Sequence, residues 1–114
     1  MSWQFSRDYI NEKHFKKFKN NEDDLASCLA NLDRLGKLLE EHGHPNKIQT
    51  NWFKSEKGSV WRIAQRKQQN SREIRLYVYI CIVNGIIYLL EIGDKSSQST
   101  DIQACKEKVK SILK

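Results

Sequence analysis

Four basic side chains in the second half of this sequence are of the types that hold a phosphodiester. Arg62 and Arg66 lie on one candidate strand, Arg75 lies on the next, and Lys95 follows a third. Arg presents a planar fork to phosphate and Lys a mobile point charge, while aromatic rings stack on unpaired bases. If the strands are neighbours, these cations converge at one end of a sheet. The remaining candidate contacts to nucleic acid are Lys57, Arg72, Tyr77 and Tyr79.

The same cations suit RNA cleavage without a metal, which needs a base for the 2′-hydroxyl, a donor for the leaving oxygen and positive charge for the phosphorane. Arg62, Arg75 and Lys95 are the candidate catalytic residues, because they would stabilise that charge. A conventional base is missing beside them, since all three histidines lie in the first 44 residues. The competing interpretation is a solvated strand face on which Arg75 and Asp94 form a cross-strand ion pair.

Neither a metal nor a cofactor is expected. His42-Gly43-His44 has the spacing of two metal ligands, but it lies at the expected end of a helix, where His42 offsets the helix dipole. The loop from Gly93 to Gln98 lacks the glycine spacing of a nucleotide site. Its simpler role is to connect the last strand to the last helix.

The net charge of +6 lies in the middle of the chain and favours a polyanionic partner. Residues 47–75 hold eight Lys or Arg against two Glu, whereas the flanking parts are close to neutral. The three Cys are scattered among apolar neighbours, which is typical of reduced thiols in a cytoplasmic protein. We expect no membrane partner, because the longest apolar run, 76–90, is short for a span and is interrupted by Asn84-Gly85.

Asn84-Gly85 between two runs of β-branched and aromatic residues is the strongest short-range signal of a β-hairpin. A two-residue type I′ turn would fix the register of the two strands. Both strands are apolar on both faces near the turn, which predicts the centre of a sheet covered on two sides. The expected pairs are Val83 with Ile86, Tyr79 with Leu90, Tyr77 with Ile92 and Arg75 with Asp94.

Periodicity predicts the other elements. Leucines recur every three or four residues from Leu25 to Leu39, which predicts a helix that begins near Asn21 and ends at Gly43. Weaker patterns predict an edge strand over 1–6, a helix over 11–19, strands over 48–54 and 60–66, a central strand over 72–83, and a closing helix that starts from a capping box at 100–103.

Three segments of the last third resemble the RelE/ParE-type toxins of bacterial toxin-antitoxin modules, especially the addiction-module killer proteins. They are Arg75-Leu76-Tyr77-Val78-Tyr79, Gly93-Asp94-Lys95-Ser96-Ser97-Gln98 and Asp101-Ile102. The resemblance is specific over residues 72–114 and architectural before them. It implies ribosome-dependent mRNA cleavage, as in some members, or gyrase inhibition without nuclease activity, as in others.

We therefore expect residues 1–114 to form one α+β domain of RelE/ParE type, with N-terminal helices, a twisted, mainly antiparallel sheet of about four strands and a C-terminal helix. The functional hypothesis is the cytoplasmic toxin of a type II toxin-antitoxin pair, which cleaves or binds RNA on the ribosome at a basic, concave sheet face. Its expected partner is a small antitoxin that covers this face. The alternative is a non-catalytic interaction protein of the same fold, either a gyrase inhibitor or an inactive relative. The sequence leaves the oligomeric state open.

Overall fold

The β-hairpin predicted around Asn84-Gly85 lies at the centre of the fold. The computed structural model describes residues 3–65 and 73–114. Its two longest strands are β4 (Ile74–Cys81) and β5 (Ile86–Asp94), which pair antiparallel. Three shorter strands extend the sheet on either side of this pair: β1 (Gln4–Ser6), β2 (Phe53–Ser55) and β3 (Trp61–Ala64).

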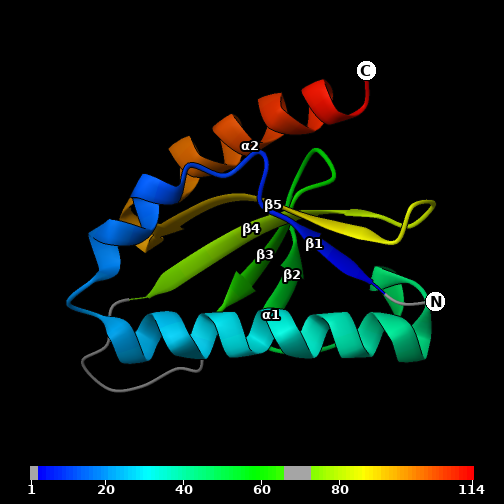
Figure 1. The fold of residues 1–114 in the computed structure, drawn as a ribbon, viewed down its shortest axis with the longest axis horizontal. Helices are drawn as coiled ribbons and strands as arrows, with labels where there is room; N and C mark the ends of the chain where they lie inside the picture. The colour runs from blue at the N-terminus through cyan, green and yellow to red at the C-terminus, as the bar shows by residue number, and fades with distance from the viewer. Residues whose placement is uncertain (1–2, 66–72) are drawn as a thin grey trace.

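The described part of the chain forms one mixed sheet in the order β1-β5-β4-β3-β2 (Figure 1). Neighbouring strands are antiparallel except for β1, which runs parallel to β5. The α+β class with a mainly antiparallel sheet is confirmed, but the sheet has five strands instead of about four. The N-terminal segment becomes the additional edge strand, where the Gln4 amide donates to the Gly85 carbonyl at 2.9 Å.

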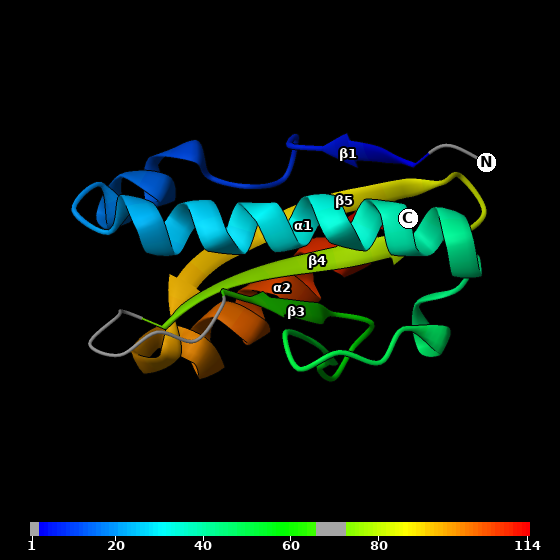
Figure 2. The ribbon, with the colours of Figure 1, turned by 90° about the horizontal axis from the view of Figure 1, so that it is seen from below.

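Two α-helices cover opposite faces of the sheet. α1 (Glu22–His42) packs against β3 and β4, and α2 (Gln98–Ile112) packs against β4 and β5 from the other side. Figure 2 shows α1 in front of the sheet and α2 behind it. The apolar pattern of the central strands therefore predicted correctly that both faces are covered.

Short 3-10 helices replace some of the predicted elements. Residues expected as a helix over 11–19 form η1 (Glu12–Phe18), in which the Asn11 side chain caps the first turn. The strand expected over 48–54 is shorter, because η2 (Pro45–Lys47) precedes an irregular segment and β2 begins only at Phe53.

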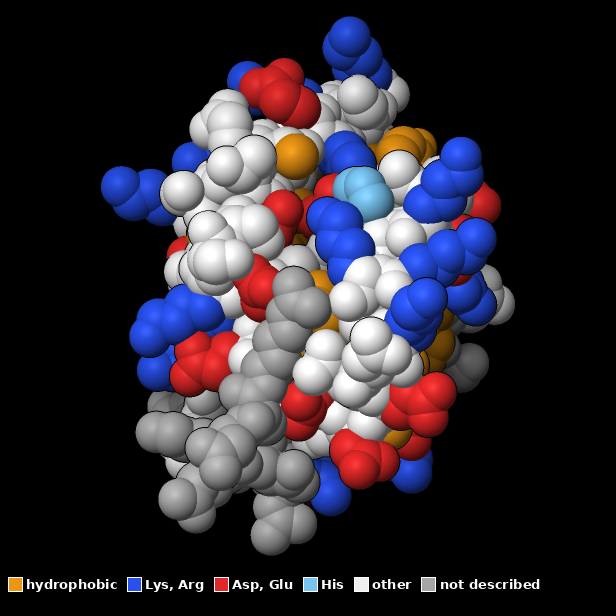
Figure 3. Space-filling model, turned by 90° about the vertical axis from the view of Figure 1, so that its left-hand side faces the viewer, with side chains coloured by type: hydrophobic (Ala, Val, Ile, Leu, Met, Phe, Trp, Pro, Cys, Tyr) orange, Lys and Arg blue, Asp and Glu red, His pale blue; other side chains and the backbone are white. Residues whose placement is uncertain are grey.

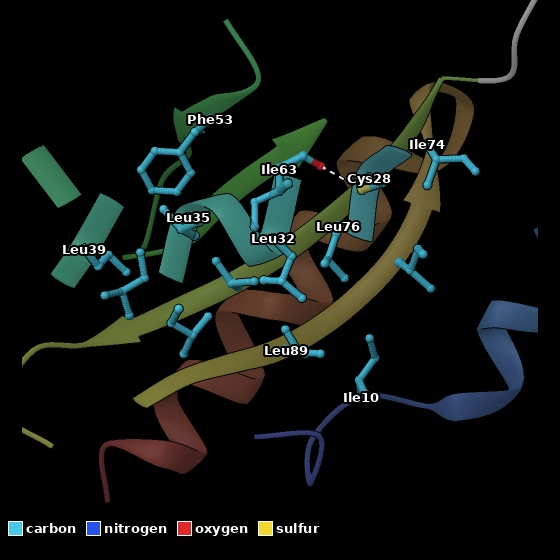
Figure 4. Packing of buried hydrophobic residues seen from close by; sticks show 14 of the residues in the cluster. Ile10, Cys28, Leu32, Leu35, Leu39, Phe53, Ile63, Ile74, Leu76 and Leu89 are labelled. Atoms are coloured by element: carbon cyan, nitrogen blue, oxygen red, sulfur yellow. Dashed lines mark hydrogen bonds between the residues drawn. The ribbon is translucent and has the colours of Figure 1, made fainter. Parts of the chain in front are cut away.

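The sheet divides the core into two clusters. The larger cluster lies between α1 and the sheet, where Leu35 of α1 packs over the strands and the Cys28 thiol contacts the Ile63 carbonyl (Figure 4). Burial raises the pKa of the Cys28 thiol to about 12, and it does the same for Cys105 under α2. Both thiols are therefore protonated at neutral pH. The smaller cluster, under α2, consists of Val60, Tyr77, Leu90, Cys105 and Val109.

The hairpin register differs from the prediction first at the turn. Residues 82–85 form the connection, so that Cys81 pairs with Ile86 and Tyr79 with Tyr88. A type I′ turn needs a positive φ at both central residues. Gly85 has a φ of 66°, but Asn84 is not among the residues with positive φ. The expected pairing of Val83 with Ile86 is therefore wrong.

A β-bulge in β5 causes the second difference. Leu90 has no partner on β4, because Leu89 pairs with Val78 and Glu91 pairs with Tyr77. The longer connection shifts the pairing by two residues from the prediction, so Tyr79 pairs with Tyr88 instead of Leu90. The extra residue reduces this shift to one, so Tyr77 pairs with Glu91 instead of Ile92.

The bulge turns two consecutive side chains toward α2. Leu90 packs in the cluster under α2, and the Glu91 carboxylate lies 3.8 Å from the Lys108 ammonium. Arg75 faces Gly93 across the ladder, and the expected cross-strand pair of Arg75 with Asp94 is wrong. Because the extra residue lies in β5, the Arg75 side chain stays on the face of β4 that also carries Tyr77.

Replacing Leu35 with Ala should destabilise the protein by about 2–5 kcal/mol, because this side chain is fully buried between α1 and the sheet. Leu29 lies on the same helix but is 37% exposed, and Leu29→Ala should cost less than about 1 kcal/mol. Urea unfolding followed by circular dichroism measures both changes. Equal losses would contradict the assignment of the buried face of α1.

Candidate functional site

Three cations from three different elements line one hollow beside the start of α2. Arg62 comes from β3, Arg75 from β4 and Lys95 from η3 (Lys95–Ser97), and the hollow has a volume of about 480 Å³. We call it the cation hollow. The structure thus brings together the three side chains that the sequence suggested as catalytic. Polar side chains of Ser96, Gln98 and Ser99 also line it.

Strand pairing places the two arginines on the same face of the sheet. Arg62 pairs with Tyr77 and Ala64 pairs with Arg75, so that Arg62 and Arg75 lie diagonally across the β3–β4 ladder. The predicted alternation of β3 is confirmed here, since Ile63 points to the opposite, α1 side.

A capping box turns the chain at the end of β5 and places Lys95. The Asp94 carboxylate accepts a hydrogen bond from the Ser96 amide at 3.0 Å, and the Asp94 amide donates to the Ser97 hydroxyl at 3.3 Å. Asp94 is therefore engaged in a helix cap rather than in an ion pair with Arg75. α2 begins at Gln98, ahead of the capping box predicted over 100–103.

Gly93 allows the first turn of α2 to lie directly on the sheet. A Cβ atom at Gly93 would be 1.9 Å from Oδ2 of Asp101, so only glycine leaves room for this carboxylate. The Ser97 hydroxyl donates to the same oxygen at 2.6 Å. Burial raises the pKa of Asp101, and the hydrogen bond from Ser97 acts in the opposite direction. The Gly93–Asp101 contact fixes how α2 closes over the cation hollow.

Each cation of the hollow has an acidic neighbour. Nη1 of Arg62 lies 3.4 Å from Glu56, and Oε2 of Glu73 lies 3.8 Å from both Arg75 and Lys95. Figure 3 shows basic and acidic side chains intermixed over the end of the molecule that carries η1 and the start of α2. The Glu73 side chain is 45% exposed, so water screens its ion pairs and an incoming anion can compete with it.

Two buried polar atoms at this place have no hydrogen-bond partner among the described residues. They are Nε of Arg75 and the hydroxyl oxygen of Tyr77. Buried polar groups are rarely left unpaired, and an exception calls for a water or a ligand. Of the two residues, Arg75 lines the cation hollow and Tyr77 does not. The Nε–H of Arg75 is a hydrogen-bond donor and therefore favours an anion as the ligand there.

The two tyrosines predicted to stack on bases are placed differently. Tyr77 is fully buried under α2, so its expected role in stacking is wrong because neither face of the ring is open. Burial raises the pKa of Tyr77, and the charge of Asp101 adds to this effect, so the phenol is protonated and cannot act as a base. Tyr79 does not line the cation hollow; it stacks on Tyr88 with a centroid separation of 5.9 Å.

Of the remaining predicted nucleic-acid contacts, Lys57 does not line the cation hollow. Lys57 lies in the turn between β2 and β3 and lines a separate, smaller hollow. Arg66 and Arg72 lie outside the residues that the structure describes.

The sequence did not predict a buried contact between His14 and Glu91. Nδ1 of His14 lies 2.5 Å from the Glu91 carboxylate, which is 3.8 Å from Lys108 on its other side. This carboxylate links η1 to β5 and α2, but His14 does not line the cation hollow and supplies no base there. The sequence did carry a signal for this contact: Glu91 is a charged residue within the otherwise apolar strand over 86–92. A buried charge needs a partner.

Comparisons with protein-family models, characterised proteins and solved structures find no match to this chain. In the described ranges, neither α1 nor α2 combines the length and the apolar content that crossing a membrane requires. The same ranges contain no group of three His, Cys, Asp or Glu side chains arranged to bind a metal. The functional argument therefore depends on the geometry of the cation hollow.

Gly93→Ala should destabilise the protein by about 1–3 kcal/mol, because the added methyl group overlaps the Asp101 carboxylate. Asp101→Ala in the same chain removes the overlap, so the double variant should lose less stability than the sum of the single variants. Thermal unfolding of the four proteins measures this coupling. Strictly additive losses would mean that the contact does not determine how α2 packs.

Proposed function

We propose that this chain is an RNA-binding toxin of the RelE/ParE type, which holds the RNA backbone in the cation hollow and inhibits translation. The observation that carries the proposal is the convergence of Arg62, Arg75 and Lys95 on one hollow. The Nε–H of Arg75, which has no acceptor among the described residues, supports an anionic ligand, and the basic middle segment supports a polyanion. The expected inhibitor is a small antitoxin that covers the hollow.

The cation hollow is suited to stabilising negative charge on a phosphate. Arg62, Arg75 and Lys95 would offset the charge that builds up on a phosphorane. Among the described residues, no imidazole or carboxylate lines the hollow. The neighbouring carboxylates of Glu56 and Glu73 are ion-paired with its cations, and the buried Tyr77 is protonated. Cleavage would therefore need the ribosome to supply a base or the substrate geometry, and we expect no cleavage of free RNA.

A non-catalytic interaction protein of the same fold, such as a gyrase inhibitor, is the second candidate. The described residues that line the hollow include no base, which favours this candidate. The ion pairs with Glu56 and Glu73 also favour it, because they offset part of the positive charge. The two candidates differ in whether translation is inhibited through RNA.

Arg75→Ala should weaken binding of single-stranded RNA at least about tenfold, because it removes a charged hydrogen-bond donor from the centre of the hollow. Lys47→Ala is the matched control, since Lys47 is an exposed cation of the same basic segment on η2 and does not line the hollow. Fluorescence anisotropy with a labelled RNA across a salt series gives both affinities. Equal losses from the two variants would reduce the hollow to one part of a general basic surface.

Expression of the chain should arrest translation, and Lys95→Ala should relieve the arrest with the fold intact, because Lys95 is largely exposed. Loss of one cation that stabilises the phosphorane should slow cleavage by about 10²- to 10³-fold, as for removal of an oxyanion donor. Primer extension on mRNA from expressing cells detects the new 5′ ends. Arrest without new ends would mean that the chain inhibits translation by binding RNA without cutting it. The absence of both would exclude the proposed function and leave the non-catalytic interaction protein.

A further inference from the structure

A second, smaller hollow continues from the cation hollow along α2. Its volume is about 250 Å³, and it shares Ser99 and Ile102 with the cation hollow as common walls. Two lysines line this smaller hollow: Lys57 from the turn between β2 and β3, and Lys106 from α2. The two hollows are therefore adjacent along the first half of α2. The half-buried Ile102 separates the cations of one hollow from those of the other.

The turn between β2 and β3 is shaped to receive the stem of Lys106. Gly58 has a φ of 75°, and a Cβ atom built there would lie only 2.8 Å from Cγ of Lys106. The amide of Glu56 closes the turn by donating to the Val60 carbonyl at 2.7 Å. The aliphatic part of Lys106 thus lies against the glycine, and this packing holds Lys106 beside Lys57.

Both lysines are available to a ligand. In the parts of the chain that the structure describes, neither Lys57 nor Lys106 takes part in an ion pair. Glu56 also lines the smaller hollow, but its carboxylate lies 3.4 Å from Arg62 and is directed to that guanidinium. The smaller hollow therefore attracts an anion independently of the cation hollow.

We propose that the Lys57–Lys106 hollow is a second phosphate subsite, which binds the nucleotide next to the one held by Arg62, Arg75 and Lys95 in a single-stranded RNA. The proposal rests on the proposed function and extends it. In single-stranded RNA, phosphates alternate with the apolar faces of the bases. The cations on the two sides of Ile102 would bind successive phosphates, and Ile102 would contact the base between them. Hollows of this size suit ligands as large as single nucleotides, and neither is large enough to enclose a duplex.

The test compares short and long oligouridylates in anisotropy titrations. Lys57→Gln and Lys106→Gln remove one charge each while they keep the stem that packs on the turn. Each variant should bind a hexanucleotide about three- to fivefold more weakly, which is the contribution of one exposed ion pair. Each should also lower the log-log salt slope by about 0.7, while binding of a dinucleotide that carries one bridging phosphate stays unchanged. Lys47→Gln and Lys110→Gln, on exposed parts of η2 and α2, are the controls.

Four outcomes would overturn the subsite. If Lys57→Gln and Lys106→Gln bind the hexanucleotide as the parent does while Arg75→Ala weakens it, the subsite is wrong and the proposed function stands. If the two variants weaken dinucleotide and hexanucleotide equally, the lysines act only through long-range charge. If a duplex of the same length shows the same losses, the ligand is not a single strand. Failure of the parent protein to bind any of these RNAs would overturn both the subsite and the proposed function.

Discussion

The extra residue in β5 is the constraint on which the rest of the site depends. Because Leu90 has no partner on β4, both Leu90 and Glu91 point toward α2, one into the apolar cluster and the other toward Lys108. The shift also places Gly93 opposite Arg75. Because Gly93 has no side chain, the Asp101 carboxylate fits against it and α2 packs on the sheet. The position of α2 then encloses the cation hollow on one side.

The sequence predicted the elements better than their contacts. The Asn-Gly hairpin, the leucine face of α1 and the alternation of β3 were readable because each is a local pattern. The register was not readable, because a bulge and a longer turn depend on how β5 packs under α2. The predicted convergence of Arg62, Arg75 and Lys95 nevertheless held, since side-chain alternation within β3 and β4 does not depend on the pairing partner in β5.

The location of the cations limits what the site can do. The sheet face that carries Arg62 and Arg75 is covered by α2 over most of its apolar part, so RNA would approach the junction of sheet and helix rather than an open concave face. Glu73 bridges Arg75 and Lys95, and Glu56 neighbours Arg62. These carboxylates lower the affinity for any isolated anion, which favours ligands that offer several phosphates at once. The geometry thus fits a backbone-binding role more directly than self-sufficient catalysis.

The most direct measurement is an NMR titration of the arginine Nε–Hε signals with single-stranded RNA. If the cation hollow binds the RNA backbone, the signals of Arg62 and Arg75 should shift together and saturate at the same RNA concentration. The Nε of Arg75 should change most, because it has no acceptor among the described residues in the free protein. Arg7, paired with Glu12, and Arg34, exposed on α1, should stay unchanged. Shifts at Arg7 or Arg34 without any at Arg75 would contradict the account.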